Sequence, residues 1–169
     1  MSIENTTYLN YLIEISKTGR QRGFLDLCQI TLPNVYTTIL RLMNNLETAK
    51  TVTVKTYLTA WKEIKNFNEK IPLIIWLKNI AINLAMEELS VRHFVTQKET
   101  TTEENLSELE ILERAIQNLP FEERIVFVLH DLEGYSFNEI KTFFPDSIID
   151  ELKTNLTNAR NILVEKLFS

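Results

Sequence analysis

The sequence has little of what secreted, β-sheet and membrane proteins need. Its 169 residues include one cysteine, three glycines and four prolines. A lone Cys28 excludes an internal disulfide and a cysteine-rich zinc site, which fits a reducing compartment. So few glycines and prolines disfavour an all-β fold, because such a fold needs frequent turns. No uncharged apolar run reaches the roughly 18 residues of a membrane helix, and the N-terminus has no signal-peptide pattern, so we expect a cytoplasmic protein with no membrane contact.

Signatures of catalysis and of metal binding are also missing. The only histidines are His93 and His130, and neither belongs to an HExxH motif or to a Cys-His pair. There is no glycine-rich phosphate loop. His130 precedes Asp131, but neighbouring residues on a helix point apart and do not form a dyad. We therefore expect a protein that is not an enzyme, with no cofactor and no metal.

Apolar residues make up 44% of the chain and recur at the spacing of α-helices. This periodicity predicts an all-α fold. Two Ser-x-x-acid patterns, Ser136 to Glu139 and Ser147 to Asp150, predict the starts of the last two helices. The predicted helices span 4–17, 22–44, 48–65, 71–92, 106–118, 121–131, 136–143 and 147–167.

Charge divides the chain into two parts. Residues 1–95 hold 11 Lys/Arg and 8 Asp/Glu (+3), whereas residues 96–169 hold 7 and 15 (−8), which together give the net charge of −5. The stretch 96–107, TQKETTTEENLS, is polar and acidic and has no helical stripe. We interpret it as a flexible acidic linker between a first unit, residues 1–95, and a second unit, residues 108–169.

The second unit contains the string AIQNLPFEERIVFVLHDLEGYSFNEI at 115–140. It has a Leu-Pro pair, a Val-Phe-x-Leu run, a Leu-Glu-Gly turn and a Ser-aromatic-x-Glu-Ile helix. This order closely resembles region 4 of the extracytoplasmic-function (ECF) sigma factors of the sigma-70 superfamily, and the resemblance is that of a divergent member. The resemblance implies a helix-turn-helix whose last helix enters the major groove of the −35 element.

The first unit resembles region 2 of the same family. Trp76, Leu77, Ile80, Ala81 and Asn83 reproduce the Trp-Leu-x-x-Ile-Ala-x-Asn signature of the helix that melts promoters. The resemblance covers about nine-tenths of the chain. It implies two small helical domains that bind core RNA polymerase, recognise the −10 element and open the strands, without covalent catalysis.

The resemblance also implies three sets of contact residues. The −10 set, which would hold unstacked bases of the non-template strand, is Asn66, Asn68, Lys70, Lys78, Asn79, Asn83 and Arg92. The −35 set is Lys153, Asn155, Thr157, Asn158 and Arg160. The polymerase-binding set is Glu47, Thr51, Val54, Tyr57 and Trp61.

The chain departs from the family where charge matters. Lys50, Thr51 and Val54 stand where the polymerase-docking helix usually has an acidic pair and a glutamine. Asn155 and Asn158 replace two basic residues of the recognition helix. Fewer cations mean fewer phosphate contacts. Two hypotheses follow: another factor brings the chain to DNA, or this chain has simply diverged from the family and contacts DNA through Asn, Thr and backbone amides.

The partners implied by the resemblance are core RNA polymerase, promoter DNA as duplex and as melted non-template strand, and an anti-sigma factor. The recruitment hypothesis adds a DNA-targeting partner, such as an activator or a nuclease-inactive RNA-guided CRISPR effector. The alternative function is a sigma-like adaptor or inhibitor that binds polymerase, or another protein, without initiating transcription.

Overall fold

The computed structural model describes residues 3–43, 45–92 and 107–168, and all regular structure in these ranges is helical. The all-α prediction is confirmed. The predicted linker lies outside the described residues except for Ser107. Within the described ranges, no helix is long and apolar enough to span a bilayer, and no group of acidic, histidine or cysteine side chains is arranged to hold a metal ion.

The first unit consists of α1 (Ile3–Lys17), α2 (Gln21–Leu42), α3 (Leu46–Glu63) and α4 (Leu73–Arg92), with a short 3-10 helix at Ile64–Asn66. Gly19, with φ of +84°, takes the left-handed conformation that ends α1. At Gly23 an added Cβ would lie 2.5 Å from Ile15 Cγ2, so α1 and α2 pack closely there.

Local capping explains where α3 and α4 begin. The Asn45 side chain accepts a hydrogen bond from the Thr48 amide (2.9 Å), the expected N-cap arrangement for α3. The Pro72 carbonyl accepts from the amides of Ile75 and Trp76. Proline therefore stands just before α4, where its missing N–H costs nothing.

The second unit consists of α5 (Glu108–Gln117), α6 (Phe121–Phe127), a π-helix at Val128–Leu132, α7 (Phe137–Phe143) and α8 (Ile149–Phe168). Capping boxes start α5, with Ser107 and Glu110, and α7, with Ser136 and Glu139, and the second of these was predicted. The predicted start of the last helix at Ser147 differs from the observed start at Ile149. The Ser147 amide instead donates to the Phe144 carbonyl (3.1 Å) and closes the turn after α7.

The predicted helix 121–131 changes character at Val128. There the amide of Glu133 donates to the Val128 carbonyl (3.1 Å) and that of Tyr135 to the Leu129 carbonyl (3.0 Å). Gly134, with φ of +78°, completes this wide turn in the left-handed region. The turn carries Glu133 out of the second unit toward α2 and α4.

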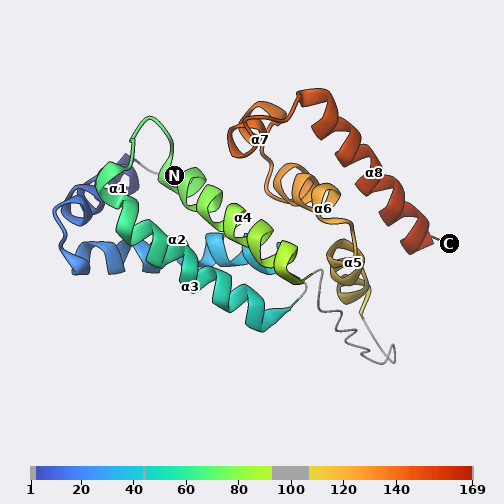
Figure 1. Cartoon of the computed structure of the whole chain (residues 1–169), viewed down its shortest axis with the longest axis horizontal. Coiled ribbons are helices and arrows are strands. Elements are labelled where there is room, and N and C mark those ends of the chain that lie inside the picture. The colour runs from blue at the N-terminus through green and yellow to red at the C-terminus, as the bar shows by residue number, and fades with distance from the viewer. Residues whose placement is uncertain (1–2, 44, 93–106, 169) are drawn as a thin grey trace.

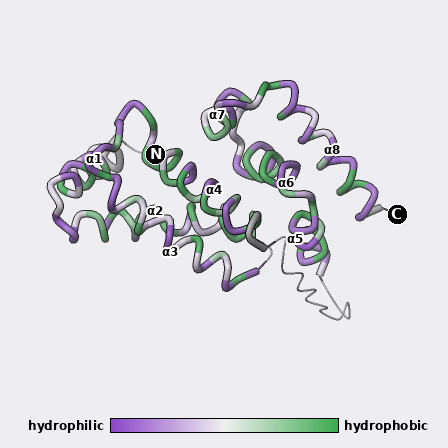
Figure 2. Tube along the Cα trace, viewed as in Figure 1, coloured by the Kyte–Doolittle hydropathy of each residue, from purple (hydrophilic) through white to green (hydrophobic). Residues whose placement is uncertain are grey.

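The two units pack directly against each other (Figure 1). The first core is built inside α1–α4 and contains the fully buried Val35, Ile39 and Val52. The second core, inside α5–α8, also takes in Leu42 from α2 and Ile82 from α4, both with no exposed surface. The contact joins α2 to α5, α6 and the π-helix, and α4 to α7, and hydrophobic and hydrophilic residues alternate along these helices (Figure 2). The chain thus has an inter-unit contact, which the sequence left undecided.

Candidate nucleic-acid interface

At the centre of the inter-unit contact lies a buried ion pair. Lys78 of α4 is 2% exposed, and its Nζ donates to Glu133 Oε2 of the second unit. The hydroxyl of Thr38, on α2, donates to Glu133 Oε1 (2.5 Å). Each carboxylate oxygen of Glu133 therefore has its own donor from the first unit. We call Lys78, Thr38 and Glu133 the latch.

Tyr135 completes the surroundings of the latch. Its hydroxyl accepts a hydrogen bond from Lys78 Nζ (3.3 Å), and its ring centre lies 5.1 Å from the same nitrogen. The ring also packs edge-on against Phe143 (5.6 Å). A cation held between a carboxylate and an aromatic face is well compensated for its burial. Removing one partner of such a buried pair typically costs about 3–5 kcal/mol, because the other charge is left unpaired.

The −10 residues of α4 thus differ in exposure. Lys78 is buried in the latch, and Asn79 is half-buried, with its Nδ2 donating to the Thr142 carbonyl of α7 (3.4 Å). Asn83, one turn further along α4, is exposed. Arg92 is the last residue of α4, and its side chain lies outside the described part of the structure. The second unit therefore covers part of the predicted melting face.

The loop that precedes α4 presents the remaining −10 residues to solvent. Asn66, Asn68 and Lys70 are all exposed. Buried Phe67 anchors the loop between them by packing on Trp76, with ring centres 4.8 Å apart. The Asn68 side chain accepts from the Lys70 amide (3.0 Å), which fixes the turn.

This loop is also tied to α1. Lys17 forms ion pairs with Glu69 of the loop and with Glu14 of its own helix. The hydrogen bond from Lys17 lowers the pKa of the Glu69 carboxyl from its ordinary value. The exposed amides of the loop are therefore held on a braced turn and are available for base edges.

The predicted −35 residues occupy two faces of α8. At 100° per residue, Lys153, Thr157 and Arg160 fall on one side of the helix, and Asn155 and Asn158 fall on the other. Thr157 donates its hydroxyl to the Lys153 carbonyl (2.9 Å), and Lys153 lies 3.4 Å from the Asp150 carboxylate. The helix does not bring the five residues together on one reading surface.

Arg160 is held by a bidentate pair within the second unit. Its Nε and Nη2 donate to the two carboxylate oxygens of Asp131, each at 2.8 Å. These hydrogen bonds lower the pKa of the Asp131 carboxyl below its ordinary value. His130 Nδ1 lies 2.7 Å from the same carboxylate, so the expectation that these two neighbouring side chains point apart is wrong. A cation engaged in this way has fewer N–H groups available for DNA phosphates.

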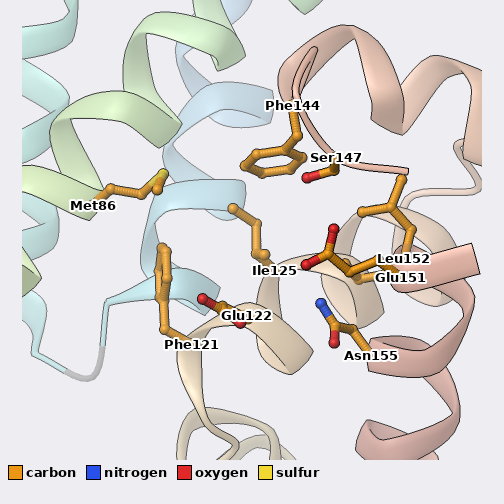
Figure 3. A pocket seen from close by; sticks show the side chains of 10 residues that line it. Met86, Phe121, Glu122, Ile125, Phe144, Ser147, Glu151, Leu152 and Asn155 are labelled. Carbon is orange, nitrogen blue, oxygen red and sulfur yellow. The ribbon is translucent and has the colours of Figure 1, made fainter. Parts of the chain in front are cut away.

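Asn155 points into a pocket of about 150 Å³ at the edge of the inter-unit contact (Figure 3). Met86 of α4 and Phe121 of α6 form one side, and Glu151 lies beside Asn155 on α8. Glu122 adds a second carboxylate, and the lining residues include no lysine or arginine. This face of α8 therefore turns toward the first unit and is acidic.

The predicted polymerase-binding residues of α3 also separate by burial. The Tyr57 hydroxyl lies 2.9 Å from that of Thr31, and burial raises the Tyr57 pKa to about 12. Trp61 packs on Phe24, with ring centres 5.0 Å apart. Both rings pack against the first core, as the sequence indicated for aromatics in these helices.

The exposed face of α3 carries the other three predicted residues, Glu47, Thr51 and Val54. It continues into Leu58, which is not a member of the predicted polymerase-binding set. Val54 is 59% and Leu58 57% exposed. The spacing 47, 51, 54 and 58 puts all four on one helix face, a signal that could have found Leu58. Glu47 also pairs with Lys50 (2.7 Å), at one of the positions where the chain departs from its family.

The sequence and the fold are both similar to those of known sigma factors. Residues 109–140 match the family described as Sigma-70, region 4. No curated protein matches the sequence. The fold is similar to the sigma factor RpoE of Bartonella quintana, solved in complex with the anti-sigma factor NepR, with a TM-score of 0.73 and 20% identity over 86% of this chain and 97% of that one. It is also similar to CnrH, solved with the cytosolic domain of CnrY, with a TM-score of 0.68 and 18% identity over 95% of this chain and 97% of that one.

The resemblance to the ECF sigma factors is confirmed. It is supported by region 4 in the sequence and by the fold of both units together. The family match covers residues 109–140, and the similarity to RpoE and CnrH shows the fold of the chain. The roles of individual residues remain predictions.

Proposed function

We propose that this chain is an ECF-type sigma factor, which binds bacterial core RNA polymerase and directs promoter recognition, strand opening and initiation. The observation that carries the proposal is a region 4 sequence at 109–140 in a chain with the complete two-unit fold of sigma factors. The two units correspond to region 2, residues 1–95, and region 4, residues 108–169. Because its proposed partner is RNA polymerase, we expect the protein to act in the cytoplasm.

The exposed face of α3 is the proposed polymerase-docking surface. Val54 and Leu58 give it an apolar centre, and Glu47 gives it a carboxylate at one end. Apolar residues that stay exposed next to each other typically mark a protein interface. Because Lys50 neutralises Glu47 in the free chain, we expect this contact to depend more on apolar burial than on charge.

The loop 66–71 and the adjoining face of α4 are the proposed site for the melted −10 strand. Asparagine amides have both a donor and an acceptor and can read base edges. Asn66, Asn68 and Asn83 are exposed on this surface, and Lys70 adds a cation for the backbone. All residues of the proposed −10 site therefore belong to the first unit, and the second unit covers two of them, Lys78 and Asn79.

We propose that a DNA-targeting partner compensates for weak −35 binding by α8. Lys153 lies near Asp150, Arg160 is paired with Asp131, and Asn155 turns into an acidic pocket. Such a helix offers little positive charge to a phosphate backbone. An activator or a nuclease-inactive RNA-guided CRISPR effector would supply the missing affinity. Contact through Asn, Thr and backbone amides alone is the competing hypothesis.

An anti-sigma factor is a further proposed partner. The structures of RpoE and CnrH were solved with NepR and with the cytosolic domain of CnrY. Since those chains share this fold across both units, a protein inhibitor of the same kind is the partner we expect to regulate this one.

Transcription in vitro with cognate core polymerase tests the function. We compare the wild-type chain with Asn83→Ala and with a control, Asn10→Ala, which removes an exposed amide from α1. The proposal predicts specific initiation by the wild type and the control and reduced strand opening by Asn83→Ala. Core binding without initiation by the wild type would instead establish the adaptor alternative.

A further inference from the structure

We propose that Lys78 and Thr38 form an anion-binding site for a nucleic-acid backbone phosphate, and that Glu133 of the chain's own region 4 fills this site while the two units are packed together. The inference rests on the proposed function, because it deepens the role of the α4 face in holding the melted strand. It adds an intramolecular competitor that the promoter strand must displace.

The chemistry of the site is that of an anion receptor. One ammonium and one hydroxyl, from two different helices, donate to separate oxygens of a single carboxylate. A phosphodiester likewise offers two unesterified oxygens that accept such donors, and lysine is a common phosphate ligand. The two donors therefore match the chemistry of a phosphodiester as they match that of the Glu133 carboxylate.

While the two units are packed together, the site is buried and needs an anion. Lys78 is 2% exposed, and Thr38 has no exposed surface. An ammonium in such surroundings is costly to leave without a counter-charge. In this packed arrangement the ring of Tyr135 also lies against the Lys78 ammonium, and the exclusion of water strengthens the attraction of Lys78 to an anion.

The backbone turn of the second unit positions the Glu133 carboxylate in this site. The π-helix at Val128–Leu132 and the left-handed Gly134 put Glu133 at the tip of a wide turn. Single π-turns are rare in proteins, and those that occur are often found at functional sites. Opposite net charges of the two parts of the chain, +3 for residues 1–95 and −8 for residues 96–169, favour the same closed arrangement.

The consequence is competition. While Glu133 occupies the site, Lys78 is unavailable to DNA, and Asn79 is engaged by the Thr142 carbonyl. The apparent affinity for a single strand is then reduced by the fraction of molecules that are closed. Opening of the units on polymerase would free both side chains at the moment the strand arrives.

The test uses the full chain and two readouts. The first is the rate at which an amine-acetylating reagent modifies Lys78, measured by mass spectrometry relative to exposed Lys65. The second is the affinity for a fluorescent single-stranded DNA oligonucleotide, measured by anisotropy. The variant is Glu133→Gln, and the control is Glu165→Gln, which makes the same charge change at an exposed position of α8.

The proposal predicts that Glu133→Gln shifts the open-to-closed ratio by on the order of a hundredfold, because Lys78 loses its counter-charge. Acetylation of Lys78 then rises toward that of Lys65, and single-strand affinity rises about tenfold or more. The control leaves both unchanged. If Lys78 stays protected in Glu133→Gln, the latch is refuted. If Lys78 becomes reactive and affinity does not rise, the phosphate site is refuted.

A double variant keeps the test independent of folding. Lys78→Glu with Glu133→Lys restores an ion pair across the contact but puts a carboxylate on the DNA side. We expect thermal stability close to that of the wild type and single-strand affinity at or below the wild-type value. Tighter binding than the wild type would overturn the assignment of Lys78 as the phosphate ligand.

These outcomes separate the inference from the proposed function. If Glu133→Gln binds the oligonucleotide tightly but no form of the chain initiates transcription, the anion site stands and the sigma function fails. If the wild type initiates, Asn83→Ala is impaired and Glu133→Gln changes neither readout, the function stands and the inference fails.

Discussion

The two surfaces predicted to contact DNA are masked in different ways. On α4 the cation is hidden by another domain, because Lys78 is buried against Glu133 of the second unit. On α8 the cation is masked locally, since Arg160 is half-exposed but held in a bidentate pair with Asp131 of its own unit. Separation of the two units would uncover Lys78. Arg160 would be released only if another group replaced Asp131 as its partner.

This difference means that the two predicted DNA-contact surfaces become accessible by different events. On the proposed function, a single rearrangement of the units on polymerase would expose Lys78 and Asn79 together. Arg160 gains nothing from that movement, because Arg160 and Asp131 belong to the same unit and move together. We therefore expect variants at the inter-unit contact to change single-strand binding, and variants at Asp131 to change duplex binding.

The largest expected effect comes from Ile82→Ala. Ile82 belongs to α4 but lies fully buried in the core of the second unit. Truncating a buried isoleucine costs about 2–5 kcal/mol. We predict faster hydrogen exchange of the α6 amides, measured by mass spectrometry.

The matched control for Ile82→Ala is Val52→Ala, which creates a cavity in the first core alone. Its effect should stay within α1–α4. If Ile82→Ala leaves the exchange of α6 at the wild-type rate, the second core does not extend into α4 in solution.

A smaller effect is expected from Gly134→Ala. A non-glycine residue in the left-handed region costs about 1–2 kcal/mol. Gly19 and Gly134 share this conformation, with φ of +84° and +78°, and an added Cβ meets nothing within 4 Å at either site. Gly134→Ala and Gly19→Ala should therefore lose similar thermal stability.

Only Gly134 supports the turn that carries Glu133. We predict faster acetylation of Lys78 in Gly134→Ala and an unchanged rate in Gly19→Ala. Equal acetylation rates in the two variants would show that the turn does not control the latch.

Asp131→Asn tests the local mask on α8. Exposed ion pairs contribute about 0.2–1 kcal/mol, so folding should change little. Releasing Arg160 should raise duplex affinity a few-fold and steepen its salt dependence by about one counterion. The control is Asp146→Asn, the same charge change at an exposed site. Equal gains in both variants would mean that only net charge matters.

The pH dependence of this pair has a definite sign. The hydrogen bond from Arg160 holds the pKa of Asp131 below its ordinary value of 3.8. A carboxyl with a lowered folded-state pKa stabilises the fold above the unfolded pKa and loses that contribution as the pH falls through the folded one. Asp131 should thus contribute no change in duplex affinity between pH 5 and pH 8, as titration of wild type and Asp131→Asn in parallel would show.

Cys28 provides the smallest expected effect. Burial raises the pKa of its thiol to about 11. At pH 8 its thiolate fraction is then about a hundredfold below that of an ordinary cysteine, so a disulfide reagent should react slowly. Because Cys28 packs on the first core, Glu133→Gln should leave this rate unchanged. A faster rate would mean that the variant loosens the first unit itself.

The sequence predicted what depends on local chemistry. Helix positions followed from apolar periodicity, the start of α7 from the Ser136-Glu139 capping box, and the end of α1 from Gly19. Placing Tyr57 and Trp61 in the core followed from the apolar face of their helix. These features involve residues within a few turns of each other.

What the sequence could not give are contacts between distant residues. Lys78 and Glu133 lie 55 positions apart; in the sequence Lys78 looks like an ordinary charged residue of a helix, and Glu133 looks like an ordinary residue of the Leu-Glu-Gly turn. Arg160 and Asp131 are similarly 29 positions apart. The π-turn was also missed, since the string 121–131 has the periodicity of a continuous α-helix. Consequently the sequence could name the residues of the −10 set, but it could not predict that Lys78 and Asn79 are covered by the second unit.

The most direct test is the distance between the two units in the intact chain. Spin labels at Lys65→Cys and Asn161→Cys, both exposed positions, would be measured in a Cys28→Ser background with and without core polymerase. We predict one narrow distance distribution for the free chain and a shift to longer distances in the polymerase complex. A broad, long distribution in the free chain would contradict the closed arrangement.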